Sequence, residues 1–175
     1  AVIDLKALNE LLPDWRENGA PLDCPVSEDK VLFLTKQRAF KLPVTPCFQN
    51  HGNYVISLGL LTRWLAEQAE NLGVEIYPGF AAAEILYHAD GSVKGIATGN
   101  MGVGKDGEVT EMFQAGMELH AKQTLFAEGC RGSLSKQLIR RFELDKHSQP
   151  QTYGIGIKEI WEIPAEKSRP GLVMH

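Results

Sequence analysis

The first candidate for chemistry is a glycine-containing turn between an apolar segment and an amphipathic one. The apolar run Thr124–Ala127 leads into Glu128-Gly-Cys-Arg-Gly132, and Ser133–Phe142 has helical spacing. This order predicts a strand, a turn and a helix whose first N–H groups can bind an anionic group or a ribose. The two glycines permit close approach to the backbone, and Glu128 can accept a hydrogen bond from a hydroxyl. The alternative is a tight connection that needs glycine for its dihedral angles alone.

The second candidate is a pair of glycines in the alternating segment Tyr153-Gly-Ile-Gly-Ile157. Residues 153–163 alternate with period two, which predicts a strand with one bulky, apolar face. Gly154 and Gly156 leave the other face bare, and bare strand glycines mark places where a ligand or another backbone comes close. A helix packed over the glycines would explain the same pattern.

Residues 31–48 form the third candidate, an apolar hairpin with basic neighbours. Two short strands, Val31–Thr35 and Ala39–Phe48, are predicted on either side of the polar tip 36–38. Two prolines place the second strand at a sheet edge, because proline cannot donate to a ladder. The basic neighbours are Lys30, Lys36, Arg38 and Lys41. Such a hairpin suits a membrane interface, and an arm packed against another domain is the alternative.

Several other kinds of site are absent from the sequence. No GxGxxG follows a predicted strand, and neither a GxSxG nucleophile turn nor a Walker A motif occurs. The five histidines lack the spacing of metal ligands. Cys24, Cys47 and Cys130 are too widely separated for a disulfide framework or a zinc knuckle, which favours a reducing compartment.

Composition excludes further classes of protein. Hydrophobic residues make up 43% and charged residues 23%, as in a chain that buries a core. The net charge of −4, without a basic stripe, argues against nucleic-acid binding. No apolar run approaches the roughly 18 residues of a membrane span. Residues 1–12 have neither a basic start nor an apolar core, so no signal peptide is expected.

The elements that would position these candidates are short and mixed. A helix over Leu5–Leu12 should end at Pro13, and a longer one over Leu58–Leu72 should bury Leu58, Leu61, Leu65, Ala69 and Leu72. Ser57 and Gly73 fit its two ends. The remaining predictions are strands at 74–77, 81–87, 92–98, 117–127 and 153–163, hairpin turns at 89–91 and 105–107, and a helix at 133–142. The predicted fold class is α+β, with mixed or antiparallel sheets and a few helices.

Several long blocks resemble one family of oxidoreductases. They are Asn50–Tyr54, Glu67–Glu70, Val74–Gly79, Asp90–Thr98, Phe126–Cys130 and Pro150–Gly156. In these blocks, and in their order, the chain resembles an internal part of the electron transfer flavoprotein–ubiquinone oxidoreductases. The similarity extends over essentially the whole chain.

The resemblance implies cofactors and partners. The family combines a glutathione-reductase-type FAD domain, a ubiquinone domain and a [4Fe–4S] domain on the surface of the inner mitochondrial or cytoplasmic membrane. Electrons pass from electron transfer flavoprotein to ubiquinone. The family's GxGxxG turn and cluster cysteines have no counterpart in this sequence. The expectation is therefore that these residues alone bind neither FAD nor a cluster and are inactive.

The resemblance also implies roles for individual residues. The FAD contacts would be Ala82, Ala83, Glu128, Gly129, Cys130 and Gly132, and the quinone contacts Tyr153 and Gly154. No metal ligand is implied, and the 31–48 hairpin would dip into the membrane. Regions 1–80 and 120–145 would be associated with the FAD domain, whereas 81–120 and 146–175 would be sheet regions, the latter resembling the ubiquinone domain.

Two other functions remain open at this point. One is a different FAD enzyme of the same superfamily, of the geranylgeranyl reductase or hydroxylase type, with a substrate sheet in place of the quinone site. The other is a binding module without a cofactor. Cysteines that bind an iron–sulfur cluster elsewhere in the full-length protein would favour the electron transfer flavoprotein–ubiquinone oxidoreductase, and their absence would favour another FAD enzyme.

Overall fold

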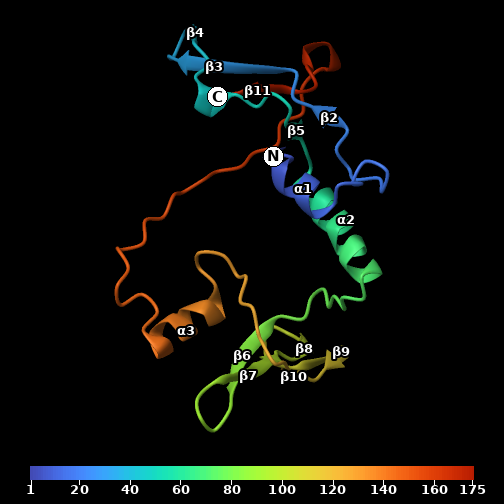
Figure 1. Ribbon diagram of the computed structural model, residues 1–175, viewed down its shortest axis with the longest axis vertical. Coiled ribbons are helices and arrows are strands. Elements are labelled where there is room, and N and C mark those ends of the chain that lie inside the picture. The colour runs from blue at the N-terminus through green and yellow to red at the C-terminus, as the bar shows by residue number, and fades with distance from the viewer. The chain divides into compact units, whose positions relative to one another are not determined.

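The computed structural model describes residues 1–175, which form two compact units (Figure 1). Unit 1 contains Ala1–Ile76 and Lys158–His175, and unit 2 contains Tyr77–Ile157. Unit 1 combines short strands in small sheets with two α-helices, and unit 2 combines them with one, which confirms the α+β class.

Unit 1 has two three-stranded sheets. The first contains, in order, β1 (Val2–Ile3), β5 (Tyr54–Val55) and β2 (Cys24–Pro25), all antiparallel. The second contains β11 (Leu172–Met174), β3 (Glu28–Leu34) and β4 (Ala39–Leu42), with β11 parallel to β3. Short 3₁₀ turns cover Pro46–Phe48 and Ala165–Lys167.

The predicted hairpin forms between β3 and β4, but its second strand ends at Leu42 and not at Phe48, and Pro46–Phe48 form a 3₁₀ turn instead. Strands β3 and β4 pair antiparallel with Phe33 opposite Phe40, and the polar tip lies between them. Strand β4 is the sheet edge and ends immediately before Pro43. Pro43, which has no backbone N–H, therefore follows the last residue whose N–H could take part in strand pairing.

Helix α2 (Leu58–Asn71) begins and ends as the sequence predicts. The Ser57 hydroxyl accepts a hydrogen bond from the Leu60 N–H at 3.4 Å, which caps the first turn. At the other end Gly73 has a φ of +85°, a left-handed conformation that glycine adopts without strain.

The buried face of α2 differs from the predicted stripe. Leu61 is buried as expected, but Leu58 and Leu72 are exposed, and Trp64 is buried instead. The Trp64 indole N–H donates to the Asn18 carbonyl at 2.8 Å, because the loop after α1 (Lys6–Leu11) folds against the helix. The core of unit 1 consists of Leu8, Trp15, Leu22, Ile56, Leu61 and Trp64.

Unit 2 contains a three-stranded antiparallel sheet and a separate two-stranded hairpin. Strand β7 (Val93–Thr98) lies between β6 (Ala82–Tyr87) and β10 (Glu118–His120), and β8 (Met101–Val103) pairs with β9 (Val109–Gln114). The Asp90 carboxylate accepts hydrogen bonds from the N–H and hydroxyl of Ser92, which closes the predicted turn at 89–91. Helix α3 (Ser133–Phe142) buries Leu134 and Leu138 with Ile85 of β6.

Three predicted strands are wrong. Residues 74–77 and 153–163 belong to no sheet, and of the strand predicted over 117–127 only Glu118–His120 forms. An extended segment becomes a strand only when a neighbour pairs with its backbone groups, and a period-two pattern does not supply that neighbour.

We predict that Trp64→Ala lowers the free energy of unfolding by about 3–5 kcal/mol, because it empties a core position and removes an indole donor. Leu72→Ala is the matched control at the end of the same helix. Its side chain is 81% exposed, and the expected change is within about 0.5 kcal/mol. Urea unfolding measures both, and equal losses would contradict this description of the core.

Candidate functional site

The carboxylate of Glu128 holds the start of helix α3. It accepts hydrogen bonds from the Ser135 N–H at 2.6 Å, the Ser135 hydroxyl at 2.7 Å and the Leu134 N–H at 3.3 Å. The residue at the N-cap position is Gly132, which has no side chain to cap the helix. Glu128 supplies the missing acceptor from the preceding turn and satisfies N–H groups that a helix leaves unpaired.

The same contacts keep Glu128 ionised. The hydrogen bonds from the Ser135 hydroxyl and then the Ser135 N–H lower the pKa of the Glu128 carboxyl below its ordinary value, with a further contribution from the Leu134 N–H. A negative charge at this position also complements the positive end of the helix dipole.

The two glycines of the turn have different roles. Gly129 has a φ of +74°, and a Cβ built on it would meet no atom within 4 Å, so its outer side is open. A Cβ on Gly132 would collide with the Glu128 side chain and lie 2.9 Å from the Ser135 hydroxyl. Gly132 is therefore required by the packing of the carboxylate, whereas Gly129 leaves space for a ligand.

One buried polar atom lies just before the turn. The Thr124 hydroxyl oxygen is shielded from solvent and has no hydrogen-bond partner. Buried polar groups are normally hydrogen-bonded. Thr124 belongs to the irregular segment that was predicted as a strand.

The structure brings the turn and Tyr153 to one pocket. This pocket of about 210 Å³ is lined by Cys130, Lys136, Ile139, Arg140, Asp145, Gln151 and Tyr153. The Tyr153 hydroxyl donates to the Gln151 side-chain oxygen at 2.9 Å, and the Arg131 guanidinium carbon lies 5.4 Å from the Tyr153 ring centroid. The sequence presented the two candidates as separate, so their proximity is a finding of the structure.

The surroundings of Gly154 differ from the prediction. A Cβ on Gly154 or Gly156 would meet no atom within 4 Å, so neither a ligand-binding strand face nor a covering helix is present. Ile155 and Ile157 are almost fully exposed and wall no cavity in this structure. The reason is that residues 153–163 form no strand, so Ile155 and Ile157 do not line a sheet face.

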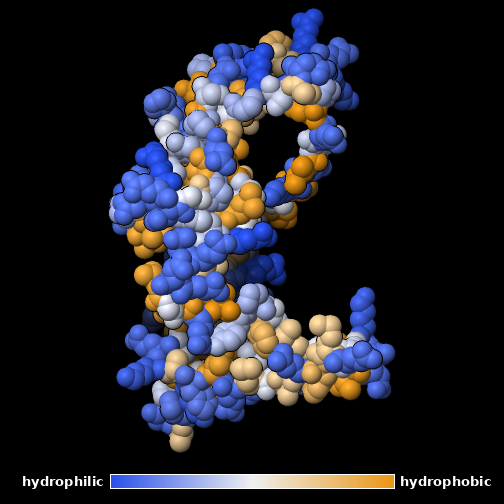
Figure 2. All heavy atoms as spheres, turned by 90° about the vertical axis from the view of Figure 1, so that its right-hand side faces the viewer, coloured by the Kyte–Doolittle hydropathy of each residue, from blue (hydrophilic) through white to orange (hydrophobic).

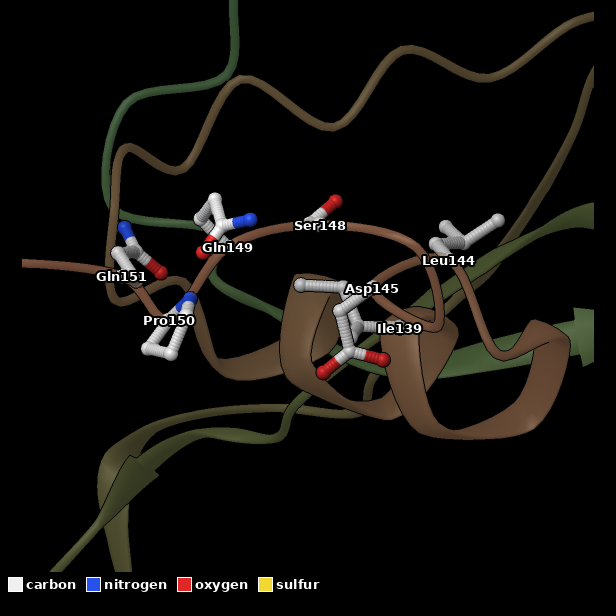
Figure 3. Close-up of a pocket in the computed structure, with 7 residues that line it drawn as sticks. All are labelled: Ile139, Leu144, Asp145, Ser148, Gln149, Pro150 and Gln151. Carbon is white, nitrogen blue, oxygen red and sulfur yellow. The ribbon is translucent and has the colours of Figure 1, made fainter.

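A larger pocket of about 500 Å³ lies beside α3 (Figure 3). Ile139 projects from the helix, and the other lining residues come from the segment that follows it: Leu144, Asp145, Ser148, Gln149, Pro150 and Gln151. Glu143 begins this segment in a left-handed conformation, with a φ of 49°. The sequence analysis did not find this pocket, and the Pro150–Gly156 block was the one signal near it.

The remaining predicted cofactor contacts lie on another element. Ala82 and Ala83 are exposed at the start of β6, where the pairing with β7 shifts register between Ala82 and Glu84. Ala82 pairs with Thr98 and Glu84 with Ala97, so Ala83 is the extra residue that the regular ladder leaves unpaired.

The chain offers no metal centre. No group of three or more His, Cys, Asp or Glu side chains is placed to hold a metal ion. All three cysteines are free thiols, with Cys24 half-buried and Cys47 and Cys130 exposed. These residues do not fit an iron–sulfur cluster, which is usually held by four cysteine thiolates.

Comparison with known proteins identifies relatives along the whole chain. A protein of Acinetobacter baylyi named "Probable electron transfer flavoprotein-ubiquinone oxidoreductase" is 62% identical over 179 residues, which are 100% of this chain and 31% of that protein. The mitochondrial electron transfer flavoprotein-ubiquinone oxidoreductases of Dictyostelium discoideum and Homo sapiens are 58% and 54% identical, again over 100% of this chain.

The family resemblance is confirmed. The chain spans about 30% of the length of these curated relatives, 31% of the first and 29% of the other two. No protein-family model matches the chain. None of its helices is long and apolar enough to span a bilayer.

We predict that Glu128→Ala speeds hydrogen exchange at the Leu134 and Ser135 amides, because their acceptor is removed. Glu143→Ala is the control at the other end of α3, where the carboxylate pairs with Lys146 on the surface. It should leave the two amides unchanged. Hydrogen exchange followed by mass spectrometry or NMR measures the difference.

The effect should depend on pH. Because the pKa of Glu128 is lowered in the folded state, its stabilising contribution is present above the ordinary glutamate pKa of about 4.3 and is lost as pH falls through the lowered value. Wild type and Glu128→Ala should therefore converge in acid. Equal protection of the Leu134 and Ser135 amides in wild type and Glu128→Ala at neutral pH would show that Glu128 does not cap α3.

Proposed function

We propose that this chain is part of an FAD-dependent oxidoreductase that passes electrons from electron transfer flavoprotein to ubiquinone. The observation that carries the proposal is the identity of 54–62% over the whole chain to proteins that bear this name. Identity at this level, without a gap in coverage, supports the same reaction in the full-length protein.

The 128–132 turn supports a role in binding FAD. Gly129 leaves open space beside the backbone at the start of α3. The Glu128 oxygen Oε1 accepts a long, 3.3 Å bond from the Leu134 N–H, and a carboxylate oxygen has capacity to accept a further bond from a ribose hydroxyl. Cys130 and Gly132 belong to the same turn, and Ala82 and Ala83 offer backbone groups on β6. FAD, when bound, would supply the electron-carrying chemistry.

The proposal includes a glutathione-reductase-type FAD domain in the full-length protein. In that domain, residues 124–127 would pair with a strand from another part of the protein. The unsatisfied Thr124 hydroxyl supports this, because an added neighbour or bound group could provide its missing partner. The assignment of 1–80 and 120–145 to this domain, and of 146–175 to a ubiquinone domain, stays a prediction.

The [4Fe–4S] cluster of the proposed enzyme would be held outside these residues. The three cysteines here are single and no metal-binding group is formed. No step of the reaction is therefore assigned to metal ligands of this chain.

Tyr153 and Gly154 are the proposed quinone contacts. A quinone headgroup needs donors for its carbonyl oxygens and apolar walls for its ring. The Tyr153 hydroxyl and the Gly154 N–H are such donors, and both residues are exposed. Ile155 and Ile157 would become walls only when another part of the full-length protein covers them.

The partners follow from the same proposal. Electron transfer flavoprotein would be the electron donor, ubiquinone the acceptor, and the inner mitochondrial or cytoplasmic membrane the surface to which the enzyme attaches. Exposed Phe33, Leu34 and Phe40 of the β3–β4 hairpin support membrane contact. Figure 2 shows hydrophobic residues reaching the surface among hydrophilic ones.

We predict that Gly129→Val in the full-length protein weakens FAD retention. A β-branched residue resists a φ of +74° and fills the open side of the turn. The flavin absorbance per protein after gel filtration measures the loss.

Gly107→Val is the matched control for Gly129→Val. Gly107 has a φ of +86° and no atom within 4 Å of an added Cβ, but it lies in the β8–β9 turn. It should lower stability by a similar amount and leave the flavin content unchanged. Equal flavin contents in the two variants would argue against a cofactor role for the 128–132 turn.

We predict that Tyr153→Phe slows quinone reduction by roughly threefold to tenfold, the equivalent of losing one neutral hydrogen bond of about 0.5–1.5 kcal/mol. Reduction of the flavin by electron transfer flavoprotein should be unaffected, because that step precedes the quinone. The two half-reactions are measured separately by stopped-flow absorbance.

Gln151→Ala tests the alternative that the Tyr153 hydroxyl only binds Gln151. This variant removes the acceptor at 2.9 Å and leaves the hydroxyl free for a quinone. If it slows quinone reduction as much as Tyr153→Phe, or if Tyr153→Phe has no effect, the quinone assignment is wrong.

A further inference from the structure

Basic residues gather at one end of the three-stranded sheet in unit 2 (Figure 1). Strands β6 and β10 both pair antiparallel with β7, so both end where β7 begins. His88 follows the last residue of β6, Lys94 is the second residue of β7, and His120 is the last residue of β10. Lys122 comes two residues later. The topology thus brings together basic residues that are far apart in the sequence.

These residues line a pocket of about 360 Å³, which we call the basic pocket. Its one other lining residue is Ala121, so its wall has neither an acidic nor a large apolar side chain. Clefts lined by one sign of charge concentrate ligands of the opposite sign. The whole chain has a net charge of −4, so the pocket is a local reversal of charge. None of its residues is a proposed contact of FAD or quinone.

Hydrogen bonds of the backbone hold the pocket in place. The Ala121 N–H donates to the Lys94 carbonyl at 3.1 Å, which extends the pairing of β7 with β10 beyond His120. The His88 N–H donates to the Ser92 carbonyl at 2.8 Å, which closes the turn between β6 and β7. The lining residues therefore belong to a fixed end of the sheet.

A β-bulge sets the position of Lys94. Across β6 and β7, Leu86 pairs with Gly95 and Tyr87 pairs with Val93. Lys94 lies between these pairs and has no counterpart in β6. Bulges re-aim side chains and occur next to functional sites, and here the bulged residue lines the pocket.

Glu118 orients the His120 ring. The His120 Nε2 lies 2.7 Å from the Glu118 Oε2. The hydrogen bond from His120, followed by the charge of Lys94, lowers the pKa of the Glu118 carboxyl below its ordinary value. The carboxylate is therefore ionised at neutral pH and can only accept, so the Nε2–H group donates. This leaves the Nδ1 atom of His120 for a ligand.

Two carboxylates beside the basic pocket limit its affinity. Glu118 lies 3.8 Å from the Lys94 ammonium group, and Asp90 accepts hydrogen bonds within its own turn. Neither lines the pocket. His88 and Lys122 form no ion pair, so their donors are available to an anion. Because the carboxylates offset part of the positive charge, we expect binding in the millimolar range.

We propose that the basic pocket binds a small phosphate monoester. Such a group carries about −1.5 to −2 charges at pH 7 and three acceptor oxygens, which suit two ammonium groups and two imidazole rings. A carboxylate has one charge and two acceptor oxygens and would use fewer of these donors. The pocket volume lies at the lower end of the range for organic ligands, about 300–1,000 Å³, so the organic part of the ester has room. The proposed electron transfer to ubiquinone does not depend on this site.

The test is isothermal titration calorimetry of the full-length, flavin-loaded protein with glycerol 3-phosphate, inorganic phosphate or glycerol at constant ionic strength. Wild type should bind glycerol 3-phosphate more tightly than inorganic phosphate, and glycerol not at all. Lys122→Gln should weaken the binding of glycerol 3-phosphate about tenfold, as expected for the loss of one hydrogen bond from a charged donor.

Two further variants separate the pocket from general surface charge. Lys105→Gln removes the same charge from the β8–β9 turn, where the lysine is exposed and forms no ion pair, and it should leave binding unchanged. Ala121→Leu narrows the pocket without a change of charge and should weaken the binding of glycerol 3-phosphate more than that of inorganic phosphate. Circular dichroism and flavin absorbance check that each variant is folded and retains its flavin.

Each contrary result has its own meaning. If wild type binds neither phosphate compound at millimolar concentrations, the site does not exist. If it binds glycerol 3-phosphate no more tightly than inorganic phosphate, the ligand class is wrong. Equal losses in Lys105→Gln and Lys122→Gln, or no effect of Ala121→Leu, would show diffuse attraction to surface charge and overturn the basic pocket as a binding site.

Discussion

The core of unit 2 depends on helix α3, and hydrogen bonds from Ser135 and Leu134 to the Glu128 carboxylate hold the start of this helix. They fix the first turn of α3, and α3 in turn buries Leu134 and Leu138 against β6. The interaction requires a glycine at position 132, because any side chain there would occupy the place of the carboxylate. The proposed cofactor contact and the stability of the helix therefore depend on the same group.

Local signals in the sequence predicted the local structure well. Ser57 marks the start of α2, Gly73 marks its end, and Asp90-Gly91 forms the β6–β7 turn. These features could be predicted because each depends on residues only a few positions apart. Strands at 124–127 and 153–163 could not be judged in this way, since a strand depends on a partner that the pattern does not reveal. The burial of Trp64 depends on the loop that contains Asn18. A loop has no hydrophobic periodicity, so the sequence pattern could not predict this contact.

The candidate site shows the same division. The glycine turn and Tyr153 were each recognisable from residue types, but their meeting at one pocket depends on how the chain returns past α3. The capping role of Glu128 also escaped prediction. Its signal was present as a glutamate seven residues before a serine in the first helical turn, a spacing outside the usual capping box.

The parallel pairing of β11 with β3 has a consequence for how the protein is made. Val173 aligns with Asp29, so the two strands come from distant parts of the sequence. A ribosome synthesises β3 and β4 long before β11, and closing so long a loop is slow compared with forming a hairpin. The nascent hairpin must therefore wait without its third strand until β11 has been synthesised, with an open edge and aromatic side chains available to a chaperone or to a lipid surface.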